Sequence, residues 1–542
     1  MLLKISFIFL VPLISNCSKA KSPPDPGPGS GGSTCVYLGV DTCKQINKTN
    51  ITIDLNTTKQ TIHSFGASDC WTTKFIGKWA DVSKKNQIAD LLFSLDTASD
   101  GSPKGIGLSL WRFNIGAGSF EQGVASNIAD EWRREECFMN ADNTYNWSKQ
   151  SGQQWFLQAA RQRGVKYSLG FSLSAPVSIS KNGKAYNSSG GTAMNIQDGK
   201  LGEYANFLSE VTKHFQFEYL SPVNEPQWAW GTATSAGQEG TQAVNKEIAS
   251  FSKLIAAKLS GSLHKIVIGE AGTLDYLYGK NTDNRGDQIS QFFSSSSSNY
   301  IGNLANVAHT ISGHSYFTSC PDNTLISVRQ QLVNKISQVD PSLETWQTEF
   351  GILGDICGQY NGSPRNISID YGLYVAKVLH HDLAIANITS WQWWLAVSPY
   401  NYSDALVYIN DPSGQINVAN CKTDGIVLDS KQLWAFGNYA RFIRPGMKRV
   451  GTTVPANNDP IVAAGTLMVS AYKNEADKKL VVVIINPENS AKTVQLNGVS
   501  VNGNMLNQYT TDATNNLKKT TTSVTEIKVA AKSVITLTGT YQ

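Results

Sequence analysis

The sequence predicts an α/β protein: a (β/α)8 TIM barrel with a side β-sandwich formed by the C-terminus plus an N-terminal strand. From about residue 60, short apolar or β-branched runs alternate with helical stretches, a pattern typical of a parallel sheet covered by helices. After about residue 444, strand-like runs separated by Gly, Asn and Pro follow one another without a helical period. The length of 542 residues exceeds what one core accommodates, so more than one domain is expected.

The barrel is predicted from eight strand-like runs, which span residues 61–69, 108–116, 165–175, 217–225, 265–271, 310–317, 344–351 and 388–397. Apolar residues recur with helical spacing between them, over residues 148–163, 197–214, 236–259 and 371–386. Eight such units close into a barrel whose chemistry lies at the C-terminal ends of its strands. Candidate catalytic residues are therefore expected at the ends of strands rather than at their beginnings.

The β-sandwich is predicted from further strand-like runs over residues 467–473, 480–486, 492–496, 504–509 and 524–537. A β-like run over 50–56, ahead of the barrel, is expected to pair with it. The chain is thus predicted to contain a signal peptide (1–17), a tether (18–48), a sandwich strand (49–60), the barrel (61–444) and the C-terminal sandwich (445–542).

The first residues are typical of an export signal. Lys4 precedes an apolar run over 5–14, which is too short to span a bilayer but has the length of a signal-peptide core. Residues 13–17 resemble a bacterial lipobox, whose cysteine, here Cys17, is lipidated, and a Pro/Gly/Ser-rich stretch follows as a flexible tether. We expect a lipid anchor in the bacterial outer membrane, on its periplasmic or its cell-surface side. An ordinary signal peptide with an incidental cysteine is the alternative.

Composition narrows the range of partners. The 46 Lys and Arg residues against 42 Asp and Glu give a formal net charge of +4, so nucleic acid is not expected as a partner. The 13 Trp, 20 Tyr and 20 Phe residues suit sugar-like ligands, although large cores use such rings too. No metalloprotease motif or phosphate-binding loop occurs in the sequence, and we expect neither a metal nor a cofactor.

Seven cysteines follow Cys17, without the paired spacing of a structural zinc site. Export permits disulfides. Cys35 with Cys43 would close a short loop, and a bond between Cys320 and Cys357 is feasible. Because seven is odd, at least one thiol stays unpaired in the monomer that we expect.

Two glutamates stand where a barrel places its chemistry. Glu225 ends the fourth run, where Pro226 blocks further strand pairing, and Glu349 lies near the end of the seventh run in an apolar setting. Retaining glycosidases use two carboxylates about 5–5.5 Å apart, one as acid/base and one as nucleophile. This pair therefore indicates glycoside hydrolysis.

Four other carboxylates compete with this pair. Glu218 and Glu344 lie at strand beginnings, the end of a barrel that serves stability. Glu270 ends the fifth run and is a subsite candidate. Glu239 lies in the loop after the fourth run, as either a subsite or a capping residue.

The motifs at the strand ends resemble those of the retaining (β/α)8 glycosidases of clan A, and within that clan glycoside hydrolase family 30. The resemblance covers about residues 50–542 and is carried by FGASD at 65–69, RFNIG at 112–116, FSLSAP at 171–176, the Asn-Glu pair at 224–225, GHSY at 313–316 and WQWW at 391–394. A side β-sandwich built from both ends of the chain is also that family's design.

The resemblance implies a role for each of these residues. Glu225 would be the acid/base and would need a raised pKa, while Glu349 would be the nucleophile and would have to stay ionised. Arg112 could hold Glu349 charged, and Tyr316 could donate a hydrogen bond to it. Asn224 would bind the 2-hydroxyl of the sugar.

Further residues would bind the sugar. Asp69 could accept hydrogen bonds from two sugar hydroxyls, and Trp394 would offer a ring face. Trp391 and Trp393 are expected in the core, because strand neighbours alternate between faces. His314 is either a functional residue or a satisfied structural group.

The stretches 221–230 and 238–240 look most like the endo-β-1,6-galactanase branch of the family, which cuts the β-1,6-galactan side chains of plant arabinogalactan. Trp228 and Trp230 would then line the cleft beside the acid/base. Two alternatives stay open. One is another activity of the family: β-1,6-glucanase, xylanase or glucosylceramidase. The other is a non-catalytic, glycan-binding lipoprotein.

Overall fold

The computed structural model describes residues 36–37, 40–41, 48–187, 193–280 and 282–542, which belong to two compact units, 1–47 and 48–542. In the first unit, β1 (Val36–Tyr37) pairs antiparallel with β2 (Val40–Asp41). The expected signal peptide with Cys17, most of the expected tether, and both Cys35 and Cys43 lie outside the described residues. Among the helices that are described, none has the length and apolar character needed to cross a membrane.

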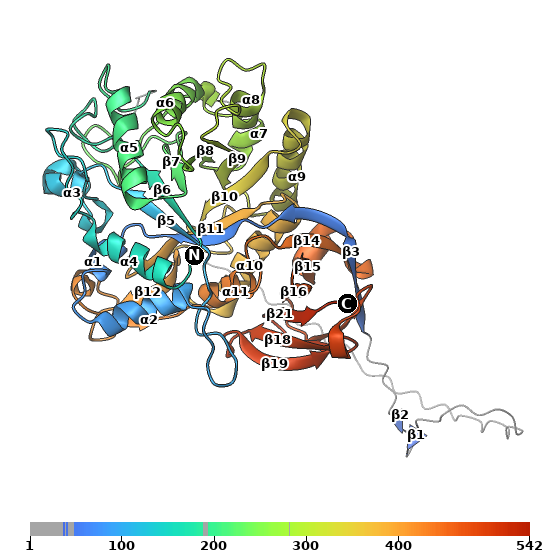
Figure 1. Ribbon diagram of the computed structural model, residues 1–542. Coiled ribbons are helices and arrows are strands. Elements are labelled where there is room, and N and C mark those ends of the chain that lie inside the picture. Colours follow the sequence, from blue (N-terminus) through green and yellow to red (C-terminus); the bar gives the residue numbers. More distant parts are fainter. Residues whose placement is uncertain (1–35, 38–39, 42–47, 188–192, 281) are drawn as a thin grey trace, which may run out of the picture. The chain divides into compact units, whose positions relative to one another are not determined.

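Eight parallel strands of the unit 48–542 close into a barrel (Figure 1). They are β4 (Ser64–Ser68), β5 (Leu110–Ile115), β6 (Tyr167–Ser172), β7 (Tyr219–Ser221), β8 (Lys265–Ala271), β9 (Val307–His314), β10 (Glu344–Phe350) and β11 (Ser390–Ser398). Each strand pairs with the next along the chain, and β11 closes the ring by pairing with both β10 and β4. Each of the eight predicted runs overlaps one of these strands, so the predicted barrel is confirmed.

Helices alternate with the barrel strands. They are α1 (Thr73–Ile76), α2 (Val82–Phe93), α3 (Ser119–Gln122), α4 (Ser151–Gln162), α5 (Leu201–Phe215), α6 (Asn245–Lys258), α7 (Asp275–Tyr278), α8 (Gln288–Phe293), α9 (Asp322–Val339), α10 (Ile369–Ala384) and α11 (Lys431–Ala440). The helix expected from residue 236 begins only at Asn245. The residues before it form a long loop after β7, in which Ala236 bridges to Ile128 and Gly240 to Tyr186.

Two strands extend the barrel sheet beyond β11. Strand β12 (Ala405–Asn410) runs parallel to β11, and β13 (Ile426–Leu428) runs antiparallel to β12. The sequence analysis does not predict either strand. They matter for the site because the loop between β11 and β12 begins at the C-terminal end of a barrel strand.

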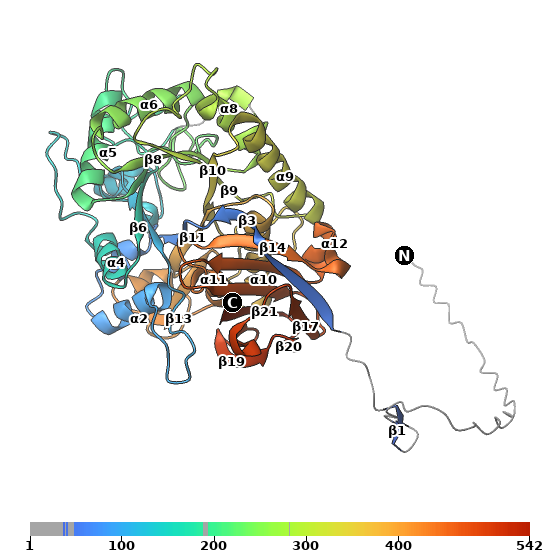
Figure 2. The same cartoon turned by 45° about the vertical axis from the view of Figure 1, so that its right-hand side comes forward.

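The second sheet has nine strands and is mostly antiparallel. In chain order they are β3 (Thr49–Thr61), β14 (Lys448–Thr453), β15 (Met468–Asn474), β16 (Lys479–Asn486), β17 (Lys492–Asn497), β18 (Met505–Thr511), β19 (Lys518–Ser523), β20 (Ile527–Val529) and β21 (Ser533–Thr540). Figure 2 shows the N-terminal strand β3 beside β14, with which it pairs antiparallel, and β3 also pairs parallel with β17. Apolar side chains from β3 and the C-terminal strands share one core, as the predicted sandwich requires.

The sequence analysis differs from this sheet in four places. Strand β14 is not among the predicted runs. The run predicted over 524–537 is two strands, separated by a turn in which Lys532 takes a left-handed φ of 47°. Strand β19 has the sequence KKTTTS and lacks the apolar alternation by which a strand is recognised. A short helix, α12 (Pro460–Gly465), interrupts a region predicted to contain only strands, and it is initiated by Pro460 and by the Asp459 side chain, which accepts from Ile461 N.

In the part of the chain that the structure describes, a disulfide between Cys320 and Cys357 links the loop after β9 to the loop after β10. This is one of the two pairings that the sequence analysis considers. Cys70, Cys137 and Cys421 are buried and unpaired. The disulfide therefore fixes two neighbouring loops at the end of the barrel where the strands terminate.

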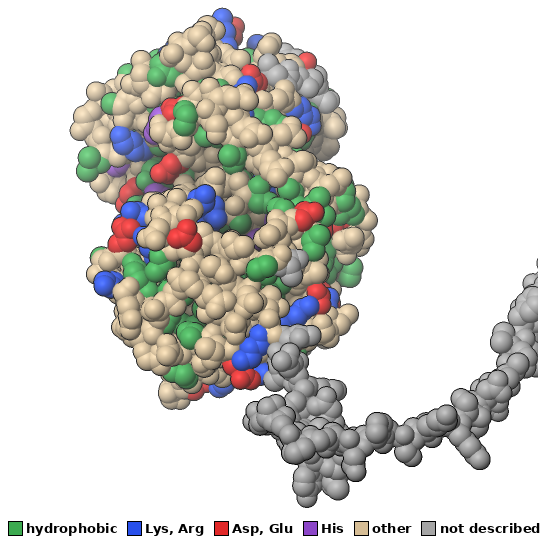
Figure 3. Space-filling model, turned by 90° about the vertical axis from the view of Figure 1, so that its right-hand side faces the viewer, with side chains coloured by type: hydrophobic (Ala, Val, Ile, Leu, Met, Phe, Trp, Pro, Cys, Tyr) green, Lys and Arg blue, Asp and Glu red, His purple; other side chains and the backbone are tan. Residues whose placement is uncertain are grey.

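The surface of the molecule in Figure 3 carries charges of both signs. Lys, Arg, Asp and Glu side chains are interspersed on this face, with hydrophobic side chains in small groups between them. This distribution agrees with the small net charge of +4.

Candidate active site

The backbone departs from regular strand geometry where the two predicted catalytic glutamates stand. Strand β7 ends at Ser221, four residues before Glu225, and Glu225 takes a left-handed φ of 42°. Its N–H donates to the carbonyl of Glu270 at 2.9 Å, which ties the end of β7 to β8. Such a conformation is rare for a residue with a side chain and persists only where the surroundings enforce it.

Irregular strand pairing occurs at the same level of the barrel. The register between β9 and β10 shifts between Gln347 and Glu349, and the register between β8 and β9 shifts before Ala271. In β8, Gly269 has a φ of 117° and the next residue, Glu270, has a φ of 46°. Bulges of this kind re-aim side chains next to active sites, and here they occur beside Glu349 and Glu270, whose carboxylates both contact Arg112.

Glu225, Glu349 and His314 converge on one point. One carboxylate oxygen of each glutamate and one ring nitrogen of His314 all lie within 4.8 Å of one another. His314 Nδ1 is 2.8 Å from Glu225 Oε1, and Nε2 is 3.3 Å from Glu270 Oε2. The sequence analysis left open whether His314 is functional or structural, and the structure places it in direct contact with one of the two predicted catalytic residues.

Arg112 connects the other members of the site. Its Nη1 donates to Glu349 Oε2 at 2.7 Å, and its Nη2 donates to Asn224 Oδ1 and to Glu270 Oε2, both at 2.8 Å. The guanidinium is fully buried and lies 3.7 Å from the ring centroid of Phe171. Tyr316 completes the surroundings of Glu349 by donating its hydroxyl to Oε1 at 3.1 Å.

The electrostatics of this cluster separate the carboxyl groups. Burial raises the pKa of Glu225 above its usual value, with the charge of Glu349 acting in the same direction and His314 opposing it. Burial also disfavours the charged form of Glu270, but Arg112 and His314 outweigh that effect and lower its pKa to about 2. The pKa of His314 is raised to about 10, because the three surrounding glutamates overcome the penalty of burial.

A metal ion does not fit this cluster. Glu225, His314 and Glu349 have the proximity of a ligand set. However, both ring nitrogens of His314 are engaged by the carboxylates of Glu225 and Glu270, and the surrounding glutamates raise its pKa to about 10 and favour the imidazolium form. Both ring nitrogens then carry protons and neither has a lone pair for a metal.

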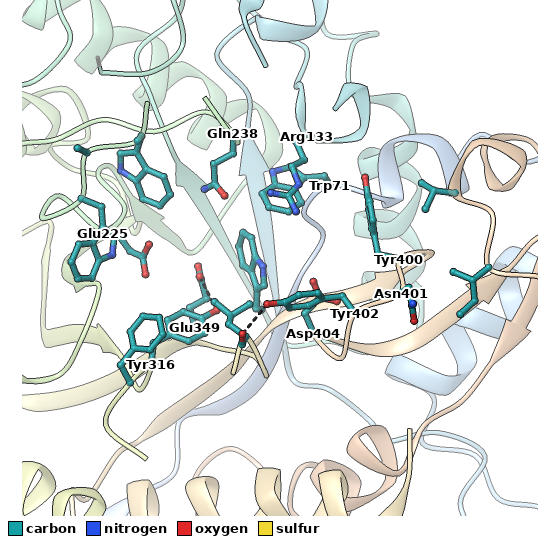
Figure 4. A pocket seen from close by; sticks show the side chains of 18 residues that line it. Trp71, Arg133, Glu225, Gln238, Tyr316, Glu349, Tyr400, Asn401, Tyr402 and Asp404 are labelled. Atoms are coloured by element: carbon teal, nitrogen blue, oxygen red, sulfur yellow. Dashed lines mark hydrogen bonds between the residues drawn. The ribbon is translucent and has the colours of Figure 1, made fainter. Parts of the chain in front are cut away.

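The two glutamates open into a cavity of about 800 Å³ at the C-terminal end of the barrel (Figure 4). In this view Glu225 and, below it, Tyr316 lie on one side, Tyr400 and Asn401 lie on the opposite side, and Glu349 lies between the two sides. Six of the predicted site residues line the cavity, namely Glu225, Glu349, Tyr316, Trp394, Trp228 and Trp230. A volume of this size is typical of a ligand-binding site.

The other four predicted site residues do not line the cavity. Arg112, Asn224 and His314 lie behind the glutamates and contact them or each other. Asp69 is fully buried; its Oδ1 accepts from Asn114 N at 2.8 Å, and its Oδ2 has no hydrogen-bond partner. Burial raises the pKa of Asp69 well above its usual value.

Two glycines allow the tryptophans of the loop after β7 to pack where they do. A side chain at Gly272 would meet the indole of Trp228 at 2.3 Å, and one at Gly240 would meet the ring of Trp230 at 2.2 Å. Trp391 and Trp393 are fully buried and donate to Asp382 Oδ2 and to the carbonyl of Asp404.

The competing carboxylates serve the scaffold. Glu239 accepts from Ala117 N and from both the N–H and the hydroxyl of Ser119, so it holds a loop rather than facing the cavity. Glu218 accepts from Ser168, and Glu344 accepts from Thr389. Glu270, considered as a subsite, is fully buried beneath Arg112 and His314.

Half of the residues that line the cavity are not among the site residues predicted from the sequence or their immediate neighbours. These residues are Trp71, Arg133, Leu353, Tyr400, Asn401, Tyr402, Asp404, Ile416 and Val418. The aromatic stretch at 400–402 directly follows the last barrel strand, which is a signal that could have been used. No such signal marks Arg133 in the sequence, because this residue belongs to a 3-10 helix (Glu131–Arg133) that is far along the chain from any strand end.

Comparisons with known proteins agree with this geometry. The model of the family described as O-glycosyl hydrolase family 30 matches residues 48–408. A conserved exported protein from Bacteroides fragilis is 31% identical and superposes with a TM-score of 0.84 over 90% of this chain and 99% of its own. Two further structures share the fold. The catalytic domain of a xylanase from Talaromyces cellulolyticus is 23% identical and superposes with a TM-score of 0.64 over 91% of this chain and 100% of its own. An endo-β-1,6-glucanase is 15% identical and superposes with a TM-score of 0.61 over 91% of this chain and 94% of its own.

Replacing Arg112 tests its role in the cluster. Arg112→Met leaves Glu270 and Glu349 buried without their cation, so the unfolding free energy at pH 7 should fall by about 3–5 kcal/mol. The loss should shrink toward pH 4. In the native protein, Glu270 has a lowered pKa, so its stabilisation is present above its unfolded pKa of about 4.5 and is lost as pH falls toward 2. Without Arg112 that stabilisation is already gone.

Urea unfolding followed by tryptophan fluorescence at the two pH values measures both effects. Arg163→Met is the matched control, because Arg163 pairs with the exposed Asp90 and its loss should cost at most about 1 kcal/mol. Equal losses for the two variants, or a loss for Arg112→Met that does not depend on pH, would contradict this view.

Proposed function

The chain belongs to O-glycosyl hydrolase family 30 and is a glycoside hydrolase; from this premise we propose that it works with retention of configuration. Glu225 is the acid/base and Glu349 the nucleophile. The observation that carries this proposal is the distance between them: their carboxylate oxygens approach within 4.8 Å. A retaining mechanism needs about 5–5.5 Å between the carboxyl groups, whereas inversion needs about 6.5–9.5 Å to admit a water.

The reaction has two displacements. In the first, a carboxylate oxygen of Glu349 attacks the anomeric carbon, the bond to the leaving oxygen breaks, and Glu225 gives its proton to that oxygen. In the second, Glu225 takes a proton from a water that attacks the same carbon, and Glu349 leaves as a carboxylate. Both substitutions invert the anomeric carbon, so the product retains its configuration.

The neighbouring residues fit these steps. His314 donates to Oε1 of Glu225, so Oε2 is free to carry the proton. Arg112 and Tyr316 each donate to a different oxygen of Glu349 and so hold the carboxylate in place. The side-chain oxygen of Asn224 accepts from Arg112, and the N–H groups of the same amide are donors that it can offer to the 2-hydroxyl of the sugar.

We infer that the substrate is β-1,6-galactan. The support is the resemblance of the loop after β7 to the galactanase branch, together with the fact that Trp228, Trp230 and Gln238 of that loop all line the cavity beside Glu225. Trp394 supplies a further ring for a sugar to stack on. Asp69 is retained as a candidate for binding sugar hydroxyls.

We also propose that the protein is exported and anchored through a lipid on Cys17. Export is supported by the signal-like sequence at 1–17 and by the 31% identity to a protein described as exported. The anchor rests on the lipobox-like residues 13–17 alone.

Replacing the nucleophile should abolish turnover. Glu349→Ala is expected to lower kcat at least about 10⁴-fold, because no covalent intermediate can form, while the far-UV circular dichroism stays unchanged. The wild-type enzyme should give a first product with the anomeric configuration of the substrate, as read by NMR before mutarotation. Near-normal turnover by the variant, or an inverted first product, would reject the mechanism, and no turnover by the wild-type protein would reopen the non-catalytic alternative.

The alkaline limb of the pH profile should belong to Glu225. As pH rises through its raised pKa, Glu225 loses the proton that it must donate, and kcat/KM falls. Glu225→Gln removes this limb, and it should retain the first displacement only with an aryl glycoside whose leaving group needs no proton. Glu239→Gln is the matched control, since Glu239 is also buried and has a pKa raised to about 7 but lies outside the cavity. A limb that survives in Glu225→Gln, or disappears in Glu239→Gln, would assign it elsewhere.

A substrate panel tests the galactan assignment. The enzyme should cleave β-1,6-galactan faster than β-1,6-glucan, glucuronoxylan or glucosylceramide, measured as released reducing ends or as ceramide. Faster cleavage of any of the other three would overturn galactan specificity and leave the retaining mechanism standing.

A further inference from the structure

Two polar atoms on the wall opposite Glu225, one in Asp404 and one in Trp71, lack a hydrogen bond, although the Asp404 carboxylate as a group also interacts with Ser398. Asp404 directly precedes β12 and is 7% exposed; Trp71 follows β4 and is 4% exposed; both line the cavity. Neither Asp404 Oδ1 nor Trp71 Nε1 makes a hydrogen bond. Buried polar atoms in native proteins are normally paired, so each exception calls for an explanation. Here the cavity offers one, because a bound ligand would supply the missing partners.

The chemistry of the two groups is complementary. A carboxylate oxygen only accepts hydrogen bonds, and an indole N–H only donates. A sugar hydroxyl does both, so neighbouring hydroxyls on one ring satisfy an acceptor and a donor together. The pair therefore suits a neutral sugar.

The position of this wall shows which part of the substrate it meets. The Trp71 and Trp394 rings pack edge to face with centroids 5.1 Å apart, and a side chain at Gly351, two residues after Glu349, would contact Trp394 at 3.2 Å. The wall thus adjoins the nucleophile, while Glu225 stands across the cavity (Figure 4). In double displacement, the sugar that bonds to the nucleophile is the glycone, and the leaving group lies beside the acid.

We propose that Asp404 is a specificity-determining residue that binds hydroxyls of the glycone, with Trp71 Nε1 donating to the same part of the sugar. The inference rests on the proposed catalytic roles, because they define which side of the cavity is the glycone side. Asp404 accepts from one or two hydroxyls of a neutral hexose. It takes no part in the proton transfers.

The energetics of Asp404 fit a group kept for binding. Burial raises its pKa to about 6, even though Arg133 and Arg365 act to lower it. The charged carboxylate is thus poorly solvated in the free protein and destabilises the fold at neutral pH. Such a cost is typical of residues retained for function.

The test is Asp404→Asn, which keeps shape and removes charge. On the glycan of the panel that the wild-type enzyme cleaves best, kcat/KM should fall about 10–100-fold, mostly through KM, because charge-assisted hydrogen bonds to the sugar are lost. The Tm at pH 7 should stay the same or rise, because an under-solvated charge has been removed. A residue with a purely structural role would give the opposite change in Tm. Trp71→Phe keeps the ring and loses the donor, and should show a smaller increase in KM.

Asp429→Asn is the matched control. Asp429 accepts from Trp434 Nε1 and Asn516 Nδ2 outside the cavity, so its loss should lower the Tm and leave KM unchanged. A kcat/KM for Asp404→Asn within twofold of the wild type, or a lowered Tm with unchanged KM, would overturn the proposal. Preference of the wild-type enzyme for another glycan would overturn only the galactan assignment, since the comparison uses whichever glycan is cleaved best.

Discussion

The buried guanidinium of Arg112 is the interaction on which the site depends. It joins β5 to the loop after β7, to β8 and to β10 through Asn224, Glu270 and Glu349. A buried cation is tolerable only when it is paired with opposite charges, and buried carboxylates are tolerable only beside a cation. Four parts of the barrel are thereby held in one arrangement. The positions of the glutamates follow from this network rather than from the barrel alone.

The balance of charges in the cluster favours the protonated form of Glu225. Arg112 and His314 bring two positive charges into a region that holds three carboxyl groups, on Glu225, Glu270 and Glu349. The cluster is neutral when one carboxyl is protonated. Glu270, with its pKa of about 2, cannot be that group. Glu225 contacts His314 but not the guanidinium, and burial raises its pKa. The acid in the proposed mechanism is thus the carboxyl farthest from compensation by Arg112.

The sequence suffices for the barrel, the sandwich and the placing of Glu225 and Glu349, because apolar periodicity and strand-end position reflect local rules. It does not reveal that β7 stops at Ser221 or that Glu225 adopts a left-handed backbone, since bulges and hydrogen bonds between strands impose these features. It also does not reveal the wall of Tyr400 and Asp404. That wall depends on the pairing of β12 with β11, which no periodic pattern in the sequence predicts.

Hydrogen-bond satisfaction separates two kinds of buried carboxylate in this protein. Glu239 accepts three hydrogen bonds from one loop, and its loss would release that loop. Asp404 lies against the cavity with Oδ1 unpaired. An unpaired buried oxygen costs stability. Because Asp404 lines the cavity, unlike Asp69, whose Oδ2 is also unpaired, a bound ligand can supply its missing partner. Such a partner at the nucleophile's side of a glycosidase cavity is the sugar itself.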